Sequence, residues 1–129
     1  MATENKKKIF LVDDEEISLE IAETILKRKY EITTAKSGKE ALEKLLKGGI
    51  IPHLILLDIK MPNMDGWETF NRLKAISFLK DIPIAFLTIL DGKSEKDHAR
   101  KIGASDFITK PYEKDALYKR IDAIINKHE

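Results

Sequence analysis

Acidic side chains follow two short apolar segments of the sequence. Asp13 and Asp14 come directly after residues 9–12, and Asp58 comes directly after residues 54–57. Carboxylates brought to one place repel one another unless one is protonated, a lysine pairs with them or a hard cation binds. Ligands that are all oxygen favour magnesium, which keeps several waters and open positions and can neutralise an incoming phosphoryl group. The three aspartates are therefore candidates for a magnesium site that handles phosphoryl groups.

Two more polar side chains follow apolar segments. Thr88 comes directly after residues 84–87, and Lys110 comes directly after residues 105–109. Lys110 could relieve the repulsion among the carboxylates by pairing with them. Taken alone, Thr88 is an ordinary β-branched strand residue and Lys110 is an ordinary loop lysine. The information therefore lies in their joint placement.

A structural interpretation of the aspartates competes with the functional one. The helix dipole favours acidic residues at the start of a helix, and Asp13 and Asp14 could be no more than such caps. Asp58 is harder to explain in this way, because it follows four apolar residues at the end of a predicted central strand. A carboxylate there is costly unless it is paired, which favours a functional role for Asp58.

Continuous apolar segments must position these polar residues. Such runs, unlike alternating ones, are typical of strands covered on both faces of a parallel sheet. Three strong runs and two weaker ones predict strands at residues 9–12, 30–35, 54–57, 84–87 and 105–109.

Apolar residues at helical spacing lie between the predicted strands and after the last one. A stripe on one side is typical of a helix that packs on a core. The stripes are Ile17, Ile21 and Ile25; Ala41, Leu42, Leu45 and Leu46; Trp67, Phe70 and Leu73; and Leu117, Ile121, Ile124 and Ile125. A fifth and more polar helix is expected over residues 93–102, and Ser37 with Glu40 has the spacing of a capping box.

The alternation of strands and helices predicts the fold class α/β, with a doubly wound parallel sheet and helices on both faces. In open sheets of this kind, ligands bind at the carboxyl ends of the strands. The side chains of Asp13, Asp14, Asp58, Thr88 and Lys110 should therefore converge at one rim of the sheet.

The composition excludes several classes of function. The chain has 23 basic and 22 acidic residues and no cysteine. The charge balance creates no overall field that would attract nucleic acid or an anionic membrane, so neither is an expected partner. The lack of cysteine excludes disulfides and thiolate metal sites, and it fits a reducing cytoplasm. No apolar run approaches the roughly 20 residues that span a bilayer, so we expect a cytoplasmic protein.

The length of 129 residues suits one compact domain and leaves no room for a second. We expect this domain to cover residues 1–129, with a flexible N-terminus at about residues 1–7 and no output domain.

Several motifs, taken together, resemble the receiver domains of two-component response regulators. They are Val12-Asp13-Asp14, Leu57-Asp58-Ile59-Lys60-Met61-Pro62 with Met64-Asp65-Gly66, Thr88, and Phe107-Ile108-Thr109-Lys110-Pro111. The resemblance covers essentially the whole chain and implies a single-domain receiver with a flavodoxin-like fold. In that fold, five parallel strands lie in the order 2-1-3-4-5 and are covered by five helices.

The resemblance also implies roles for individual residues. Asp58 would accept a phosphoryl group from the phosphohistidine of a histidine kinase or a histidine phosphotransfer protein. Asp14, Asp58 and the main-chain carbonyl of Lys60 would bind Mg²⁺ directly, and Asp13 would act mainly through water. The chain would then be a signalling phosphoacceptor rather than an enzyme, because it would catalyse only its own phosphorylation and dephosphorylation.

The resemblance further implies a switch. Thr88 and Lys110 would contact the phosphoryl oxygens, and Phe107 matches the switch aromatic of the family. That aromatic turns inward when the threonine moves, which reshapes the face formed by the fourth helix, the fifth strand and the fifth helix. A downstream protein, which the sequence does not identify, would recognise this face.

Ile89 departs from the family pattern, in which the residue after the threonine is commonly small. This bulky residue predicts slower exchange of phosphoryl groups with solvent and small donors.

Three other interpretations share part of the pattern. A Rossmann-like nucleotide-binding domain has the same alternation, but acidic residues stand at 13–16, where its phosphate-binding loop needs glycines. A magnesium-dependent phosphohydrolase with an aspartyl nucleophile would need a substrate-enclosing cap, for which 129 residues leave little room. A receiver-like interaction module that works without phosphorylation stays open, although the presence of all five site residues argues against it.

Overall fold

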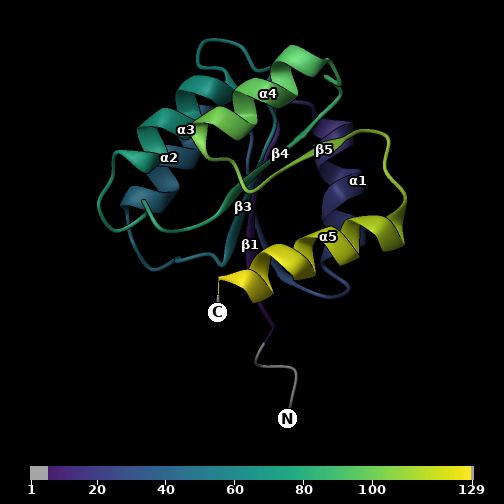
Figure 1. The fold of residues 1–129 in the computed structure, drawn as a ribbon. Helices are drawn as coiled ribbons and strands as arrows, with labels where there is room; N and C mark the ends of the chain where they lie inside the picture. The colour runs from purple at the N-terminus through teal and green to yellow at the C-terminus, as the bar shows by residue number, and fades with distance from the viewer. Residues whose placement is uncertain (1–5, 129) are drawn as a thin grey trace.

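The computed structural model describes residues 6–128, in which strands and helices alternate (Figure 1). The strands are β1 (Lys8–Val12), β2 (Glu31–Ala35), β3 (Leu54–Leu57), β4 (Ile84–Thr88) and β5 (Asp106–Thr109). The helices are α1 (Glu16–Leu26), α2 (Gly38–Leu46), α3 (Gly66–Lys74), α4 (Lys93–Ile102) and α5 (Lys114–Lys127). Residues 1–5, which belong to the predicted flexible N-terminus, lie outside the described residues.

The five strands of the described chain form one parallel sheet in the order β2-β1-β3-β4-β5. This confirms the predicted α/β class and the strand order 2-1-3-4-5. Val12 pairs with Leu57, and Thr88 pairs with Thr109, so β1 and β3 end at one level and β4 and β5 end two residues farther along. The carboxyl ends of β1, β3, β4 and β5 therefore form a common rim.

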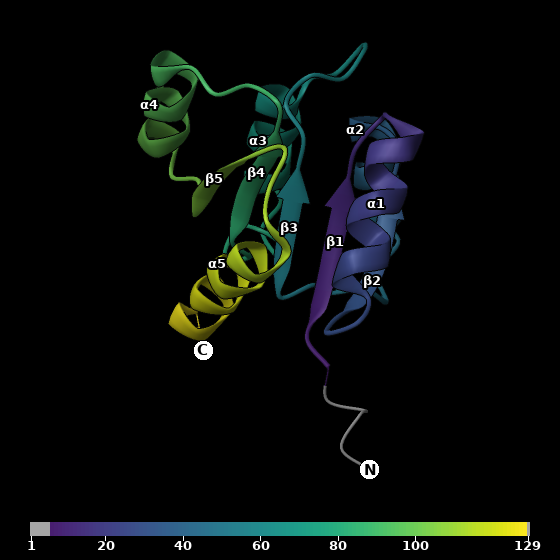
Figure 2. The ribbon, with the colours of Figure 1, turned by 90° about the vertical axis from the view of Figure 1, so that its right-hand side faces the viewer.

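Helices cover both faces of the sheet, with α1 and α5 on one face and α2, α3 and α4 on the other (Figure 2). Successive strand residues point to opposite faces. In β1, Phe10 and Val12 pack on the side of α2, α3 and α4, whereas Ile9 and Leu11 pack on the side of α1 and α5. The two-sided cover explains why β3 is apolar at every position and why β1 and β4 are apolar at all but one. None of the helices in residues 6–128 is long and apolar enough to cross a membrane.

Helix α1 differs from its predicted orientation. Ile17 is 70% exposed and Ile21 is 53% exposed, so the stripe expected to face the core lies largely at the surface. The buried stripe is Leu19, Ala22 and Leu26 instead, which also has helical spacing. The helix carries apolar residues on two sides, and spacing alone could not decide which side packs on the sheet.

Helix α4 buries few of its side chains. Of its residues, all of which the structure describes, Ala99 alone is buried. The exposed His98 ring lies 4.4 Å from the Trp67 ring at the start of α3, measured between centroids. The polar sequence of this helix thus gives a surface element with a small apolar anchor.

Candidate functional site

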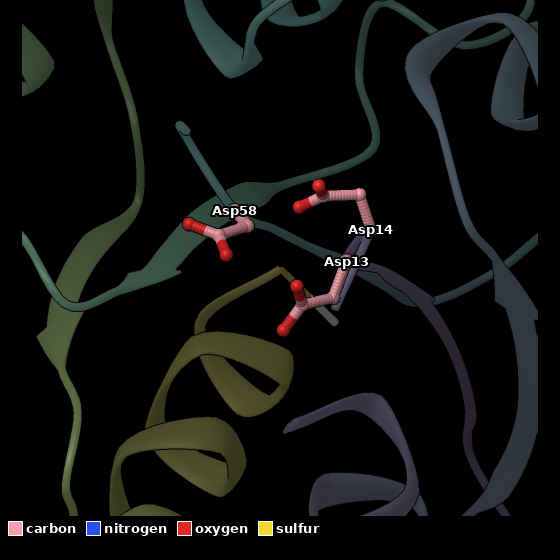
Figure 3. Close-up of side chains that lie close together, drawn as sticks. All are labelled: Asp13, Asp14 and Asp58. Atoms are coloured by element: carbon pink, nitrogen blue, oxygen red, sulfur yellow. The ribbon is translucent and has the colours of Figure 1, made fainter. Parts of the chain in front are cut away.

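Three aspartates meet where β1 and β3 end. Asp13 and Asp14 follow β1, and Asp58 follows β3, its neighbour in the sheet. One carboxylate oxygen of each residue lies within 4.8 Å of the other two, and Figure 3 shows the carboxylates around a common space. Asp13 and Asp58 are buried, whereas Asp14 is exposed. The cluster is therefore partly desolvated but open on one side.

Lys110, which follows β5, reaches into the aspartate cluster. Its Nζ atom lies 2.6 Å from Asp13 Oδ2 and 3.3 Å from Asp58 Oδ2. The same ammonium donates to Ser18 Oγ at 2.7 Å. Burial lowers the pKa of Lys110, but the hydrogen bond to Asp13 and the two negative charges outweigh it, so the pKa is raised. Lys110 is therefore a fixed positive charge at the centre of the site.

The environments of Asp13 and Asp58 push their pKa values in opposite directions. Burial alone would raise the pKa of Asp13, but hydrogen bonds from Lys110, the Glu15 amide and Ser18 lower it overall. The pKa of Asp58 is raised by burial and by the charge of Asp13, although the charge of Lys110 opposes the shift. Of these two carboxylates, Asp13 thus holds its charge more firmly, and the negative charge of Asp58 is less stabilised.

Thr88 ends β4 beside Asp58. Its side chain is fully buried, and a hydrogen bond from this residue works against the rise in the pKa of Asp58. The Thr88 Oγ atom also accepts a hydrogen bond from the Leu90 amide, at a long distance of 3.3 Å. The Lys110 amide donates to the Thr88 carbonyl at 2.8 Å, which ties the ends of β4 and β5 together.

The backbone around Asp58 is held by the start of α3. Asp65 caps this helix by accepting a hydrogen bond from the Glu68 amide at 3.0 Å. The Gly66 amide donates to the Ile59 carbonyl at 2.8 Å, and a Cβ at Gly66 would collide with the Asp58 carbonyl. A glycine is therefore required for this close approach, which fixes the segment that carries Asp58.

The site opens through a depression of about 480 Å³ that is bordered by Asp14, Lys60 and Ile89. Ile89 is 61% exposed, so its side chain stands at the mouth rather than in the core. A more apolar groove of about 390 Å³ lies next to this opening. Ile89 and Lys110 border both hollows, and the groove is otherwise walled mainly by Ile17, Ile21, Ile25, Pro111 and Tyr112. The exposed stripe of α1 is therefore one wall of a groove beside the site.

Phe107, on β5, belongs to a chain of aromatic contacts. Its ring centroid lies 6.2 Å from that of Phe86 on β4, which lies 5.6 Å from Phe70 and 4.9 Å from Trp67. Trp67 in turn contacts His98 on α4. Phe107 is half-buried, and its ring thus borders the aromatic core under α3 and α4.

The structure confirms the predicted meeting of five side chains, those of Asp13, Asp14, Asp58, Thr88 and Lys110. Lys60 lies at the opening of the site, and Phe107 lies within β5, before Lys110 in the chain. Reasoning from the sequence missed Ser18. A signal was available, because this hydroxyl lies in the first turn of the helix that follows Asp13 and Asp14, close to the predicted rim.

The chain resembles proteins of one family in both sequence and structure. The sequence profile described as "Response regulator receiver domain" matches residues 9–122. The chain is 36% identical to the Response regulator PleD of Caulobacter vibrioides over 118 residues. This aligned region is 91% of this chain and 26% of that protein. It is 37% identical to the Transcriptional regulatory protein CrdR of Helicobacter pylori over 122 residues. This aligned region is 94% of this chain and 56% of that protein.

A solved structure gives the same result. The chemotaxis protein CheY4 of Vibrio cholerae matches with a TM-score of 0.83 and 29% identity, over 92% of this chain and 98% of that chain. The chain spans about a quarter of PleD and a little over half of CrdR, so the match concerns one part of those longer proteins. This chain belongs to the response regulator receiver domain family of two-component signal transduction.

Proposed function

We propose that this chain is a phosphoacceptor, in which Asp58 takes a phosphoryl group from the phosphohistidine of a histidine kinase or a histidine phosphotransfer protein. The observation that carries the proposal is the surroundings of Asp58. This buried carboxylate lies beside Asp13, Asp14 and the Lys110 ammonium at an open rim of the sheet. A nucleophile that must meet a dianionic group needs this combination of access and positive charge.

The oxygen donors of the cluster fit a hard divalent cation. All are carboxylates, they lie within 4.8 Å of one another, and Asp14 is exposed. Asp14, Asp58 and the main-chain carbonyl of Lys60 would hold Mg²⁺, with Asp13 acting mainly through water. When bound, Mg²⁺ supplies positive charge that offsets the charge on the phosphoryl oxygens.

Three side chains of this site have different roles in phosphoryl transfer. An Asp58 carboxylate oxygen attacks phosphorus and forms an O–P bond, while the P–N bond to the donor imidazole breaks and its electron pair returns to nitrogen. Lys110 masks the negative charge of Asp58 before the donor arrives and then contacts a phosphoryl oxygen. Thr88 donates a hydrogen bond to another phosphoryl oxygen, which requires its hydroxyl to move toward the new group.

The movement of Thr88 is the proposed origin of the switch. Its hydrogen bond with the Leu90 amide is long, so breaking it costs little compared with a bond to a charged oxygen. Phe107 would turn inward as Thr88 moves, against the aromatic rings that reach α4 through Trp67. The face made by α4, β5 and α5 would change as a result, and a downstream protein would bind it.

The apolar groove beside the site suits the helix that carries the phosphohistidine. Ile17 and Ile21 supply exposed apolar surface, and Ile89 and Lys110 border both the groove and the opening above Asp58. A donor helix packed on α1 would thus bring its phosphohistidine to the mouth of the site.

The proposal also includes a cytoplasmic location and one receiver domain over residues 1–129, whose chemistry is limited to its own phosphorylation and dephosphorylation.

The test is chemical phosphorylation of the purified chain by acetyl phosphate or phosphoramidate, with Mg²⁺ or with a chelator. We expect one phosphoryl group per chain by intact mass spectrometry, labile in acid and in base, and dependent on Mg²⁺. Asp58→Asn should abolish this modification, whereas Asp81→Asn, a change at an exposed aspartate before β4, should leave it unchanged. An unmodified wild-type chain would contradict the proposal and leave an interaction module that works without phosphorylation.

A further inference from the structure

The Lys110 ammonium is held by three oxygen atoms, of which one comes from Ser18. An ammonium has three N–H donors. Its partners are Asp13 Oδ2 at 2.6 Å, Ser18 Oγ at 2.7 Å and Asp58 Oδ2 at 3.3 Å. The two short contacts go to Asp13 and Ser18, and the long one goes to the carboxylate that reacts in the proposed function. The ammonium is therefore anchored on the α1 side and directed toward Asp58.

We infer that Ser18 is a positioning residue, whose hydroxyl fixes the Lys110 ammonium so that one N–H remains aimed at the place where the phosphoryl oxygens arrive. This inference rests on the proposed function of Asp58. Ser18 itself touches neither the phosphoryl group nor its acceptor oxygen, and it acts through Lys110.

A hydroxyl suits this position because it donates and accepts at the same time. Ser18 accepts from Lys110, and its hydrogen bond to Asp13 contributes to the lowered pKa of that carboxyl group. Asp13 and Ser18 therefore hold the Lys110 ammonium together, through its two short hydrogen bonds. Because Ser18 is neutral, it adds this support without another negative charge in a site that already contains three aspartates.

The backbone of Ser18 is itself well fixed. It lies in the first turn of α1, next to Leu19, which is buried against the sheet. The phosphoryl group can therefore attract the third N–H of Lys110 while the other two donors keep their partners. Without the hydroxyl, the ammonium has one donor free and can shift toward Asp58, where it would cover the oxygen that must attack.

Ser18 also borders the apolar groove between α1 and the segment around Tyr112. A partner seated on Ile17 and Ile21 would lie beside the residue that anchors Lys110. The placement gives docking on α1 a direct physical route to the charge that receives the phosphoryl group.

The test compares three substitutions at one position. Ser18→Ala removes the hydroxyl, while Ser18→Thr and Ser18→Val have nearly the same shape and differ in that hydroxyl. The rate of phosphorylation by phosphoramidate with saturating Mg²⁺ should fall about three- to tenfold in S18A and S18V, as expected for one lost hydrogen bond, and stay within about twofold of wild type in S18T. Ser77→Ala, at an exposed serine between α3 and β4, is the matched control and should have no effect.

A second measurement needs neither Mg²⁺ nor phosphorylation. Exchange of the Lys110 ammonium protons with water, followed by ¹⁵N NMR in the metal-free protein, should be slow in wild type and S18T and at least about threefold faster in S18A and S18V. Unchanged rates in S18A and S18V would overturn the inference, and so would an equal loss in all three variants, which would indicate packing rather than hydrogen bonding. If the wild type accepted no phosphoryl group, the proposed function would fail, and the exchange rates would still decide whether Ser18 holds Lys110.

Discussion

Lys110 Nζ lies 2.6 Å from Asp13 Oδ2, although 97 positions of sequence separate the two residues. Their pair joins the ends of β1 and β5, which are not neighbours in the sheet. Both side chains are nearly buried, with 12% and 5% of their surface exposed. Removing one partner of such a pair leaves the other charge without compensation.

Lys110→Ala should therefore lower the free energy of unfolding in the presence of a chelator, by about 3 kcal/mol. Mg²⁺ should restore part of the loss, because it replaces the missing positive charge. Urea denaturation with and without Mg²⁺ measures both effects. Lys29→Ala, which breaks the more exposed pair with Asp122, should cost less than about 1 kcal/mol. Equal losses in the two variants would contradict this account of the site.

Magnesium binding should require Asp14 and Asp58. Their carboxylates belong to the acidic cluster, and Asp14 is the member most open to solvent. Trp67, the one tryptophan of the sequence, follows Gly66, which packs on the Asp58 backbone, so its fluorescence should change on titration. We expect weak binding in wild type and none in the Asp14→Ala, Asp58→Ala double variant. A titration curve that the double substitution leaves unchanged would place the metal elsewhere.

Thr88→Ala should accept a phosphoryl group but respond weakly to it. A hydrogen bond to a charged oxygen contributes about 1.5–3 kcal/mol, so its loss should cut the shift in the active:inactive ratio about ten- to a hundredfold. Amide chemical shifts of α4 and α5 before and after phosphorylation measure the response. Thr33→Ala, on the edge strand β2, should respond as wild type does. Wild-type shift changes in phosphorylated Thr88→Ala would rule out this switch.

Ile89→Ala should speed both phosphorylation by acetyl phosphate and loss of phosphate from Asp58. The side chain stands at the mouth of the site, and a small donor and the hydrolytic water both need that approach. Each tenfold change requires only about 1.4 kcal/mol in the barrier, while Mg²⁺ affinity should stay the same. Stopped-flow fluorescence and timed phosphate release give the two rates. Ile51→Ala is a control of equal exposure, 62% against 61%, and if Ile89→Ala matched it, the steric explanation would be wrong.

Tyr30→Phe should make the stability of the fold less sensitive to alkaline pH. The Tyr30 hydroxyl donates to Asp122 at 2.7 Å, and burial and this carboxylate raise the pKa of Tyr30. The unfolded chain loses the phenol proton first, near pH 10, so this stabilisation is complete below about pH 10 and declines as the pH rises toward the folded-state pKa. At neutral pH the variant should lose about 1.5–3 kcal/mol, because the lost bond goes to a charged acceptor. Parallel plots of unfolding free energy against pH from about 9 to 11 would contradict the assignment.

The strand ends could be predicted from the sequence because a single rule decides them. Residues covered on both sides must be apolar, so the first polar residue after each run marks the rim, as Asp58 and Thr88 do. Helix orientation follows no such rule when two sides are apolar, which is why Ile17 and Ile21 were assigned to the core. The role of Ser18 could not be predicted from the sequence for another reason. Its role depends on the distance to Lys110, which becomes short only when the ends of β1 and β5 are brought together.

The single buried residue of α4 has an energetic consequence. Detaching this helix uncovers the buried Ala99 and the half-buried Ile102, so we expect the free energy of local opening to lie below that of global unfolding. We therefore expect the backbone amides of α4 to exchange with deuterium faster than those of α5, which buries four side chains. In the proposed function, the face made by α4, β5 and α5 would then have a basal level of activity, set by the attachment of one helix, which phosphorylation would amplify rather than create.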